Sequence, residues 1–101
     1  MLRAYNGPIT QGAQGGITDI SGTPGSGTAN TLIAKFAIAA AASAATITCS
    51  ACAATTFIWC QVVTNDGTLK SVSVVPGAGS YVVTGNAAAT GNTTIVAWLL
   101  N

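Results

Sequence analysis

Most of the chain alternates apolar residues with small or polar ones at the two-residue period of β-strands. Phe36 and Ile38 recur at this period, and β-branched residues follow further along, so we expect short strands over 32–39 and 45–51 with an Ala/Ser turn between them. Alanine is also a strong helix former, so a helix over 33–45 is the alternative.

The clearest local pattern predicts a hairpin. The turn sequence "NDG" at 65–67 separates two alternating stretches, 57–63 and 69–75. Gly accepts positive φ, and Asn and Asp tolerate the left-handed region, so this triplet favours a tight turn. A three-residue loop would place Trp59 opposite Ser73.

Two further apolar stretches, "YVVT" and "TTIVAWLL", follow the glycine-rich "PGAGS" and the uncharged "GNAAATGN". Short strands punctuated by Gly, Pro and Asn are typical of an all-β sandwich or barrel. We therefore expect one β domain of short antiparallel strands over residues 31–101.

Residues 1–30 differ in composition, because they hold seven of the 12 glycines and two of the three prolines. So few apolar residues do not offset the entropy of ordering the chain. We expect an extended arm over 1–30 that is either disordered or ordered by lying along something else. Its candidate anchors, and so the candidate interaction residues of the protein, are Leu2, Tyr5, Ile9, Ile17 and Ile20.

Charge is scarce. Only 5% of the residues are charged and the net charge is +1, whereas about 25% is usual in soluble domains. Nucleic acid and anionic lipid are recognised by clustered Lys and Arg, so neither is an expected partner. The apolar run 32–47 is mostly alanine and contains Lys35, which argues against a membrane span. The start lacks the apolar core of a signal peptide, and we expect synthesis in a bacterial cytoplasm.

Few residues of the sequence are candidates for catalysis or metal binding. His and Glu are absent, and Asp19 and Asp66 are far apart in sequence, so no acid–base pair is evident. Cys49 and Cys52 have a CxxC spacing, but with Cys60 they make three thiols where structural zinc usually has four ligands. We interpret the three cysteines as buried reduced fillers, and on a strand Cys49 and Cys52 would point to opposite faces, which also argues against a shared metal. No cofactor, metal or catalytic residue is expected.

Four aromatic residues allow two interpretations. They could line a sugar-binding surface, or they could form core and subunit contacts, which is the commoner use of aromatics on strands. These residues are Phe57, Trp59, Tyr81 and Trp98.

The last third, "VVPGAGSYVVTGNAAATGNTTIVAWLLN", resembles the C-terminal portion of small virion structural proteins of tailed bacteriophages, in which a similar strand, loop and Trp-containing strand close a β-sandwich. The resemblance covers about thirty residues and extends more loosely back to Phe36. It implies a non-enzymatic capsid decoration (cement) protein on the virion surface.

The partners that the resemblance implies are the major capsid protein and copies of the chain itself, often as a trimer. On this hypothesis the arm crosses neighbouring capsid subunits, and Trp59 and Trp98 are buried in the core or an oligomer interface. Two alternatives stay open. One is a phage tail or fibre component with a receptor- or glycan-binding role, and the other is an ice- or surface-binding protein.

Overall fold

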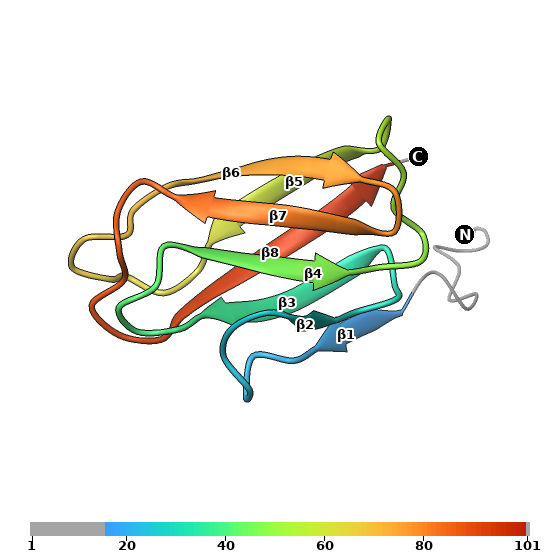
Figure 1. Ribbon diagram of the computed structural model, residues 1–101. Coiled ribbons are helices and arrows are strands. Elements are labelled where there is room, and N and C mark those ends of the chain that lie inside the picture. The colour runs from blue at the N-terminus through green and yellow to red at the C-terminus, as the bar shows by residue number, and fades with distance from the viewer. Residues whose placement is uncertain (1–15, 101) are drawn as a thin grey trace, which may run out of the picture.

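Two four-stranded sheets pack face to face in the part of the chain that the structure describes, residues 16–100 (Figure 1). The structure is a computed structural model. The strands, in chain order, are β1 (Ile17–Asp19), β2 (Gly27–Thr28), β3 (Ile33–Ile38), β4 (Ala44–Thr48), β5 (Phe57–Val62), β6 (Val72–Gly77), β7 (Ser80–Gly85) and β8 (Thr93–Leu100). The predicted β-sandwich is confirmed.

The first sheet has the order β1-β3-β8-β5, and the second sheet has the order β2-β4-β7-β6. Both sheets are mixed, because β1 pairs with β3 and β2 pairs with β4 in parallel, whereas all other pairs are antiparallel. The expectation of purely antiparallel strands therefore holds for six strands and fails for β1 and β2. The region 33–45 holds β3 and the start of β4, so the helical alternative is wrong.

Residues 16–30 belong to the sandwich, so the β domain starts well before the expected boundary at residue 31. β1 adds one edge strand to the first sheet, and β2 adds one to the second. Ile20 packs against the core and Ala29 is 1% exposed. This segment is ordered by lying along the chain's own sheets, because those sheets supply the hydrogen bonds and apolar surface that it lacks. Residues 1–15 of the predicted arm lie outside the described residues.

Segment 63–71 crosses from the first sheet to the second instead of making the expected hairpin turn. β5 pairs with β8, so Trp59 lies opposite Trp98, and β6 pairs with β7 in the other sheet. The hairpin prediction was wrong because side chains, rather than a partner strand, satisfy much of the backbone of this segment. The main one of these side chains is Asp66.

The carboxylate of Asp66 holds two loops together. It accepts hydrogen bonds from the backbone N–H groups of Thr68 and Leu69, both at 2.9 Å. It also accepts bonds from the N–H groups of Thr90 and Gly91 at 3.1 Å, and one from the Thr90 hydroxyl at 2.8 Å. These bonds, led by those from Leu69 and Thr68, hold the pKa of Asp66 well below its usual range although the residue is buried.

The small residues of "GNAAATGN" fit this junction. A Cβ on Gly85 would lie 2.7 Å from Cγ of Leu69, a fully buried side chain that fills the end of the core. Asn86 accepts hydrogen bonds from the N–H groups of Lys70 and Ser71 at 2.7 and 3.0 Å. The loop is therefore small and uncharged because it wraps closely around the crossing segment.

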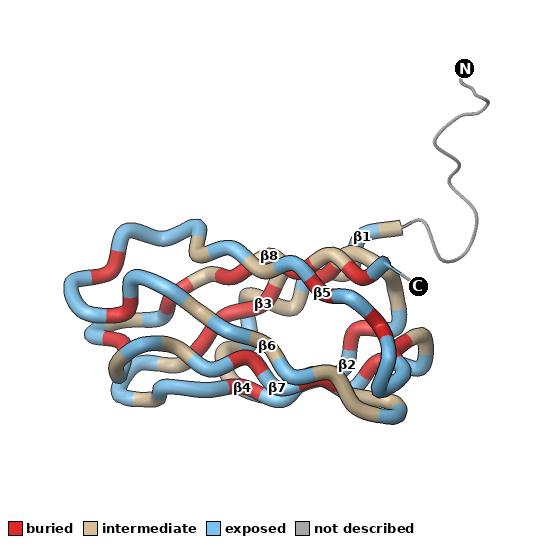
Figure 2. The backbone as a smooth tube through the Cα atoms, turned by 90° about the horizontal axis from the view of Figure 1, so that it is seen from above, coloured by how far each residue is buried: buried red, intermediate tan, exposed pale blue. Residues whose placement is uncertain are grey.

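The core lies between the sheets and draws its buried strand residues from β3, β4, β5, β7 and β8, with the half-buried Val72 and Val74 of β6 packed against them (Figure 2). Alternate residues of each strand point inward, as in the burial of Ile95, Ala97 and Leu99 on β8. Phe36 of the first sheet and Tyr81 of the second meet with ring centroids 6.4 Å apart. The Tyr81 hydroxyl is buried without a hydrogen-bond partner among the described residues.

Candidate functional site

A row of large apolar side chains crosses the outer face of the first sheet. Ile17 lies opposite Ile33, Ile33 opposite Trp98, and Trp98 opposite Trp59, so one register position on each of the four strands contributes. Side chains at paired positions point to the same face of a sheet. Ile17 is 67% exposed and Trp59 is 51% exposed. We call these four residues the tryptophan row.

The same face continues its apolar character toward the end of the sandwich where β8 ends. Phe57 pairs with Leu100 one step beyond the tryptophan row, and both are mostly exposed. Of the seven exposed large apolar residues in the described chain, four lie here: Ile17, Phe57, Trp59 and Leu100. We call the outer face of the first sheet the tryptophan face. Contiguous apolar patches of this kind mark interaction surfaces.

Trp59 and Trp98 stack on each other, with ring centroids 4.5 Å apart and an interplanar angle of 10°. Neighbouring strands are about 4.8 Å apart, so rings stacked at that spacing stand upright on the sheet. Each ring covers one face of the other and turns an edge outward. The pair therefore forms a ridge, in which the stack covers the mutual ring faces and Trp59, on the edge strand β5, stays half exposed.

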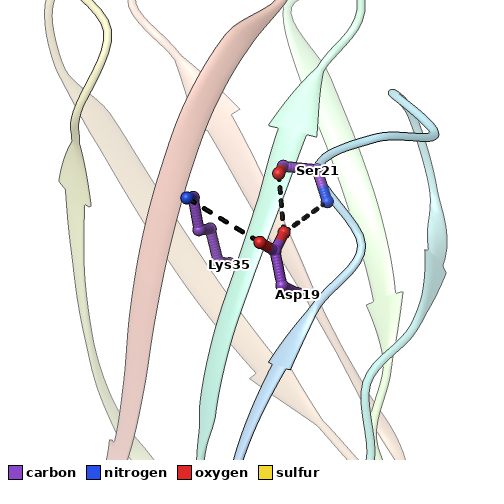
Figure 3. Close-up of polar contacts among 3 residues, drawn as sticks. All are labelled: Asp19, Ser21 and Lys35. Atoms are coloured by element: carbon purple, nitrogen blue, oxygen red, sulfur yellow. Dashed lines mark hydrogen bonds and ion pairs between the residues drawn. The ribbon is translucent and has the colours of Figure 1, made fainter.

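An ion pair occupies the next position of the tryptophan face. Asp19 and Lys35 are register partners, with Nζ and Oδ2 3.7 Å apart, and both are about half exposed (Figure 3). Asp19 also accepts hydrogen bonds from the hydroxyl and the N–H of Ser21, at 2.6 and 2.9 Å. Ser21, followed by Lys35, lowers the pKa of Asp19. The two charges neutralise each other, so the described part of this face is neutral.

The outer face of the second sheet is uncharged along its strands. Its outward positions are mostly Thr, Ser and Val, including Thr46 and Thr48 on β4 and Thr84 on β7. Val75 is 67% exposed and Val82 is 37% exposed, and they lie opposite each other. The side chains on this face are smaller and more uniform in size than those on the tryptophan face, and none of its strand positions is aromatic.

The thiols do not gather into a ligand set. Cys49 and Cys52 both belong to the core, which differs from the expected opposite orientations because both follow β4 in a turn rather than lying on the strand. Cys60 is half-buried, and burial raises its pKa to about 11. Among residues 16–100 no group of three His, Cys, Asp or Glu side chains could hold a metal ion. No helix within the same residues is long and apolar enough to cross a membrane.

Of the predicted interaction residues, Ile17 and Ile20 can be placed. Ile17 is exposed in the tryptophan row, whereas Ile20 packs against the core of its own sandwich and so is not an outward anchor. Leu2, Tyr5 and Ile9 lie outside the described residues.

The four aromatic residues divide between the core and the surface. Tyr81 is fully buried, whereas Phe57, Trp59 and Trp98 lie on the tryptophan face. The two tryptophans are therefore not core residues. Sequence reasoning did not connect them to Ile33 or Leu100, because both faces of β8 are apolar and its pattern alone does not show which one turns outward.

No protein-family model matches the chain, and neither a curated protein nor a solved structure matches it.

Proposed function

We propose that this chain is a non-enzymatic structural protein of a tailed-bacteriophage virion, a capsid decoration (cement) protein that binds the shell from outside. The observation that carries the proposal is the charge of its two broad faces. Asp19 and Lys35 are the only charged residues on the strands of the described sandwich, and they neutralise each other.

Faces of this kind suit burial against other protein. Each charge that a contact covers must lose its water, which costs free energy unless the charge finds a partner. Small side chains such as Thr, Ser and Ala also let two backbones approach closely. A shell protein that is covered on several sides at once has use for both properties.

The proposed partners are the major capsid protein and further copies of the chain, as a homo-oligomer that the resemblance gives as a trimer. The place of action is the capsid surface, after synthesis in the cytoplasm of a bacterial host. A partner that binds only the assembled shell stabilises it by mass action.

The test is to purify virus particles from the strain that encodes this chain and to search them for it by quantitative mass spectrometry. The proposal predicts a fixed ratio to the major capsid protein, and empty shells that melt at a lower temperature once the chain is stripped off. Particles that lack the chain altogether would overturn the proposal, and particles that carry it only on tails would favour the tail component.

The exposure of Trp59 favours one alternative, a tail or fibre component that binds a receptor or glycan. The ring stack covers one face of each tryptophan, and the exposed part of Trp59 and Gln61 on the same face remain available to a sugar. Immobilised host-cell envelopes that retain the chain, with retention lost in Trp59→Thr, would support this alternative.

The ice- or surface-binding alternative rests on the second sheet. Thr28 lies opposite Thr48, and Thr46 shares the face of Thr48. A measurement of ice recrystallisation at increasing protein concentration tests it, and an unchanged crystal size would exclude it.

A further inference from the structure

We propose that the tryptophan face is the surface through which two copies of this chain pair, across a two-fold axis parallel to the strands. The inference deepens the proposed function. Only the role of such a pair in a shell rests on that function. Self-association itself is a property of the chain and is measured without any shell.

The shape of the face points to a second copy. One half of the face stands higher above the sheet, because it carries the Trp59–Trp98 ridge on β5 and β8. The other, lower half carries the smaller side chains of Ile17 and Ile33 on β1 and β3. A two-fold axis along the strands, midway across the sheet, maps β5 onto the partner's β1 and β8 onto its β3. Each ridge then lies over the lower half of the other copy, as an isologous interface requires.

The charges agree with this pairing. The face carries one carboxylate and one ammonium group 3.7 Å apart, so a copy of the face brings no net charge with it. The same two-fold axis sets Asp19 against Gln61 of the other copy, whose side-chain amide can donate a hydrogen bond to the carboxylate. Lys35 lies against Val96, where its methylene groups cover apolar surface while its ammonium group stays with Asp19. A strongly charged partner would instead leave its own charges uncompensated.

The size of the face sets the strength of the contact. Five residues on each of three strands and three residues on β1, with strands about 4.8 Å apart and about 3.4 Å per residue, give about 300 Å² of flat area. That is below the roughly 800 Å² per partner of a standard interface, so we expect a reversible dimer with a dissociation constant in the micromolar range. In a shell, many such contacts act together.

Sedimentation velocity of the full chain, from about 1 μM to about 300 μM, measures the pairing. The mass should rise from the 9.9 kDa of the monomer toward twice that value, whereas a rise to three times that value would indicate the trimer that the resemblance implies and would overturn the two-fold pairing. Both tryptophans of the chain lie on this face, so acrylamide quenching of their fluorescence should fall over the same concentration range. A monomer at every concentration, with unchanged quenching, would overturn the proposal.

Trp59→Thr should weaken the dimer at least about tenfold, because it removes one of the two stacked rings that form the ridge, and large aromatic side chains carry much of the binding energy of an interface. Val75→Thr is the matched control. Val75 is also an exposed apolar residue, as exposed as Ile17 of the tryptophan row, but it lies on the outer face of the second sheet. Far-UV circular dichroism and thermal melting confirm that both variants fold. If Val75→Thr weakens the dimer and Trp59→Thr does not, another face pairs and the proposal is wrong.

Cross-linking tests the two-fold axis itself. At about 300 μM, a mixture of Ile17→Cys and Trp59→Cys chains should be joined into pairs by a bismaleimide that spans about 10 Å, the distance between facing sheets, whereas each variant alone should form few pairs, because the axis sets residue 17 against residue 59. Equal cross-linking in all three samples would refute this geometry.

Two other occupants of the face have their own outcomes. A chain that starts at residue 16 is compared with the full chain in the acrylamide quenching experiment. If its tryptophans are quenched more strongly than those of the full chain at every concentration, residues 1–15 cover the face and the proposal fails. If cellohexaose protects the tryptophans while the mass stays that of a monomer, the face binds sugar and the proposal fails as well. None of these results depends on finding the chain in virus particles, so the failure of one proposal is separable from the failure of the other.

Discussion

Asp66 takes the place of a partner strand as the acceptor for segment 63–71. A turn triplet with Asn, Asp and Gly is compatible with a hairpin, and also with an Asx-type arrangement in which the side chain binds the backbone that follows. The structure has the second arrangement, and the same carboxylate reaches across to Thr90 and Gly91. One side chain therefore fixes the path between the sheets.

Stability should depend on the ionisation of Asp66. Its pKa in the folded protein lies below the value of about 3.9 in an unfolded chain, so its contribution is complete above that value and is lost as the pH falls below it. Asp66→Asn should therefore melt at a lower temperature than the parent at pH 7, by several degrees. The difference should narrow between about pH 4 and pH 2, where the parent loses the same contribution.

Asp19→Asn is the matched control for this experiment. Asp19 also has a lowered pKa, but it is about half exposed and its loss should change the melting temperature little. A gap between parent and Asp66→Asn that stays constant down to pH 2 would contradict the assigned role of the carboxylate.

Gly85 should not tolerate a side chain. In Gly85→Ala the new Cβ would approach Leu69 Cγ to 2.7 Å, and Leu69 is fully buried, so we expect a loss of about 1–3 kcal/mol in the free energy of unfolding. Gly91→Ala, where a Cβ has no neighbour within 4 Å, is the control. Urea denaturation measures both. The double variant Gly85→Ala/Leu69→Ala should lose less than the sum of its single changes, and strict additivity would argue against the contact.

The hydroxyl of Tyr81 is a buried polar group without a partner among the described residues. Leaving such a group unsatisfied costs about 1–3 kcal/mol, so Tyr81→Phe should stabilise the protein by about 1 kcal/mol. Phe36 keeps its ring contact in the variant. Thermal unfolding followed by circular dichroism measures the change, and a loss of stability would show that the hydroxyl is satisfied in solution.

At the scale of elements, β1 and β2 are the least expected part of the fold. Both are short, with three residues in β1 and two in β2, and neither has the alternation that identifies a strand. They form because β3 and β4 offer open edges, so their structure is set by the partner strands and not by their own sequence. β8, with eight residues of strongly apolar character, was predictable from its own pattern.

A truncated chain tests the contribution of these two elements. Residues 31–101 lack both edge strands and the packing of Ile20 and Ala29, so they should be less stable than residues 16–101 by about 2 kcal/mol or more. Chemical denaturation of the two chains gives the difference. Equal midpoints would mean that β1 and β2 add nothing to the sandwich and that the boundary at residue 31 is energetically correct.

The candidate site was less predictable than the fold. Ile17 was singled out as an anchor, and the aromatics were expected at contacts, but their meeting in one row depends on the pairing of β8 with both β3 and β5. Those pairs join residues that are far apart in the chain. Local sequence patterns carry no information about which distant strand lies next to which.

At the scale of the whole molecule, the topology predicts slow folding. β6 and β7 are the only sheet neighbours within residues 16–100 that are also consecutive in the chain. Every other pair must close a long loop first, so folding should take milliseconds to seconds. Stopped-flow tryptophan fluorescence after dilution from urea measures it, since Trp59 and Trp98 come together only when β5 reaches β8. A transition faster than about 0.1 ms would contradict this expectation.

The positions of Ile17 and Leu100 near one end of the first sheet have a practical consequence. Strand directions bring both ends of the described chain out at that end, while loops 39–43, 63–71 and 86–92 gather at the opposite end (Figure 1). A peptide fused directly before residue 16 or directly after Leu100 would thus sit beside the apolar row and hinder pairing there. Inserted peptides belong instead in the distant loop 39–43, because loops 63–71 and 86–92 contain the Asp66 junction.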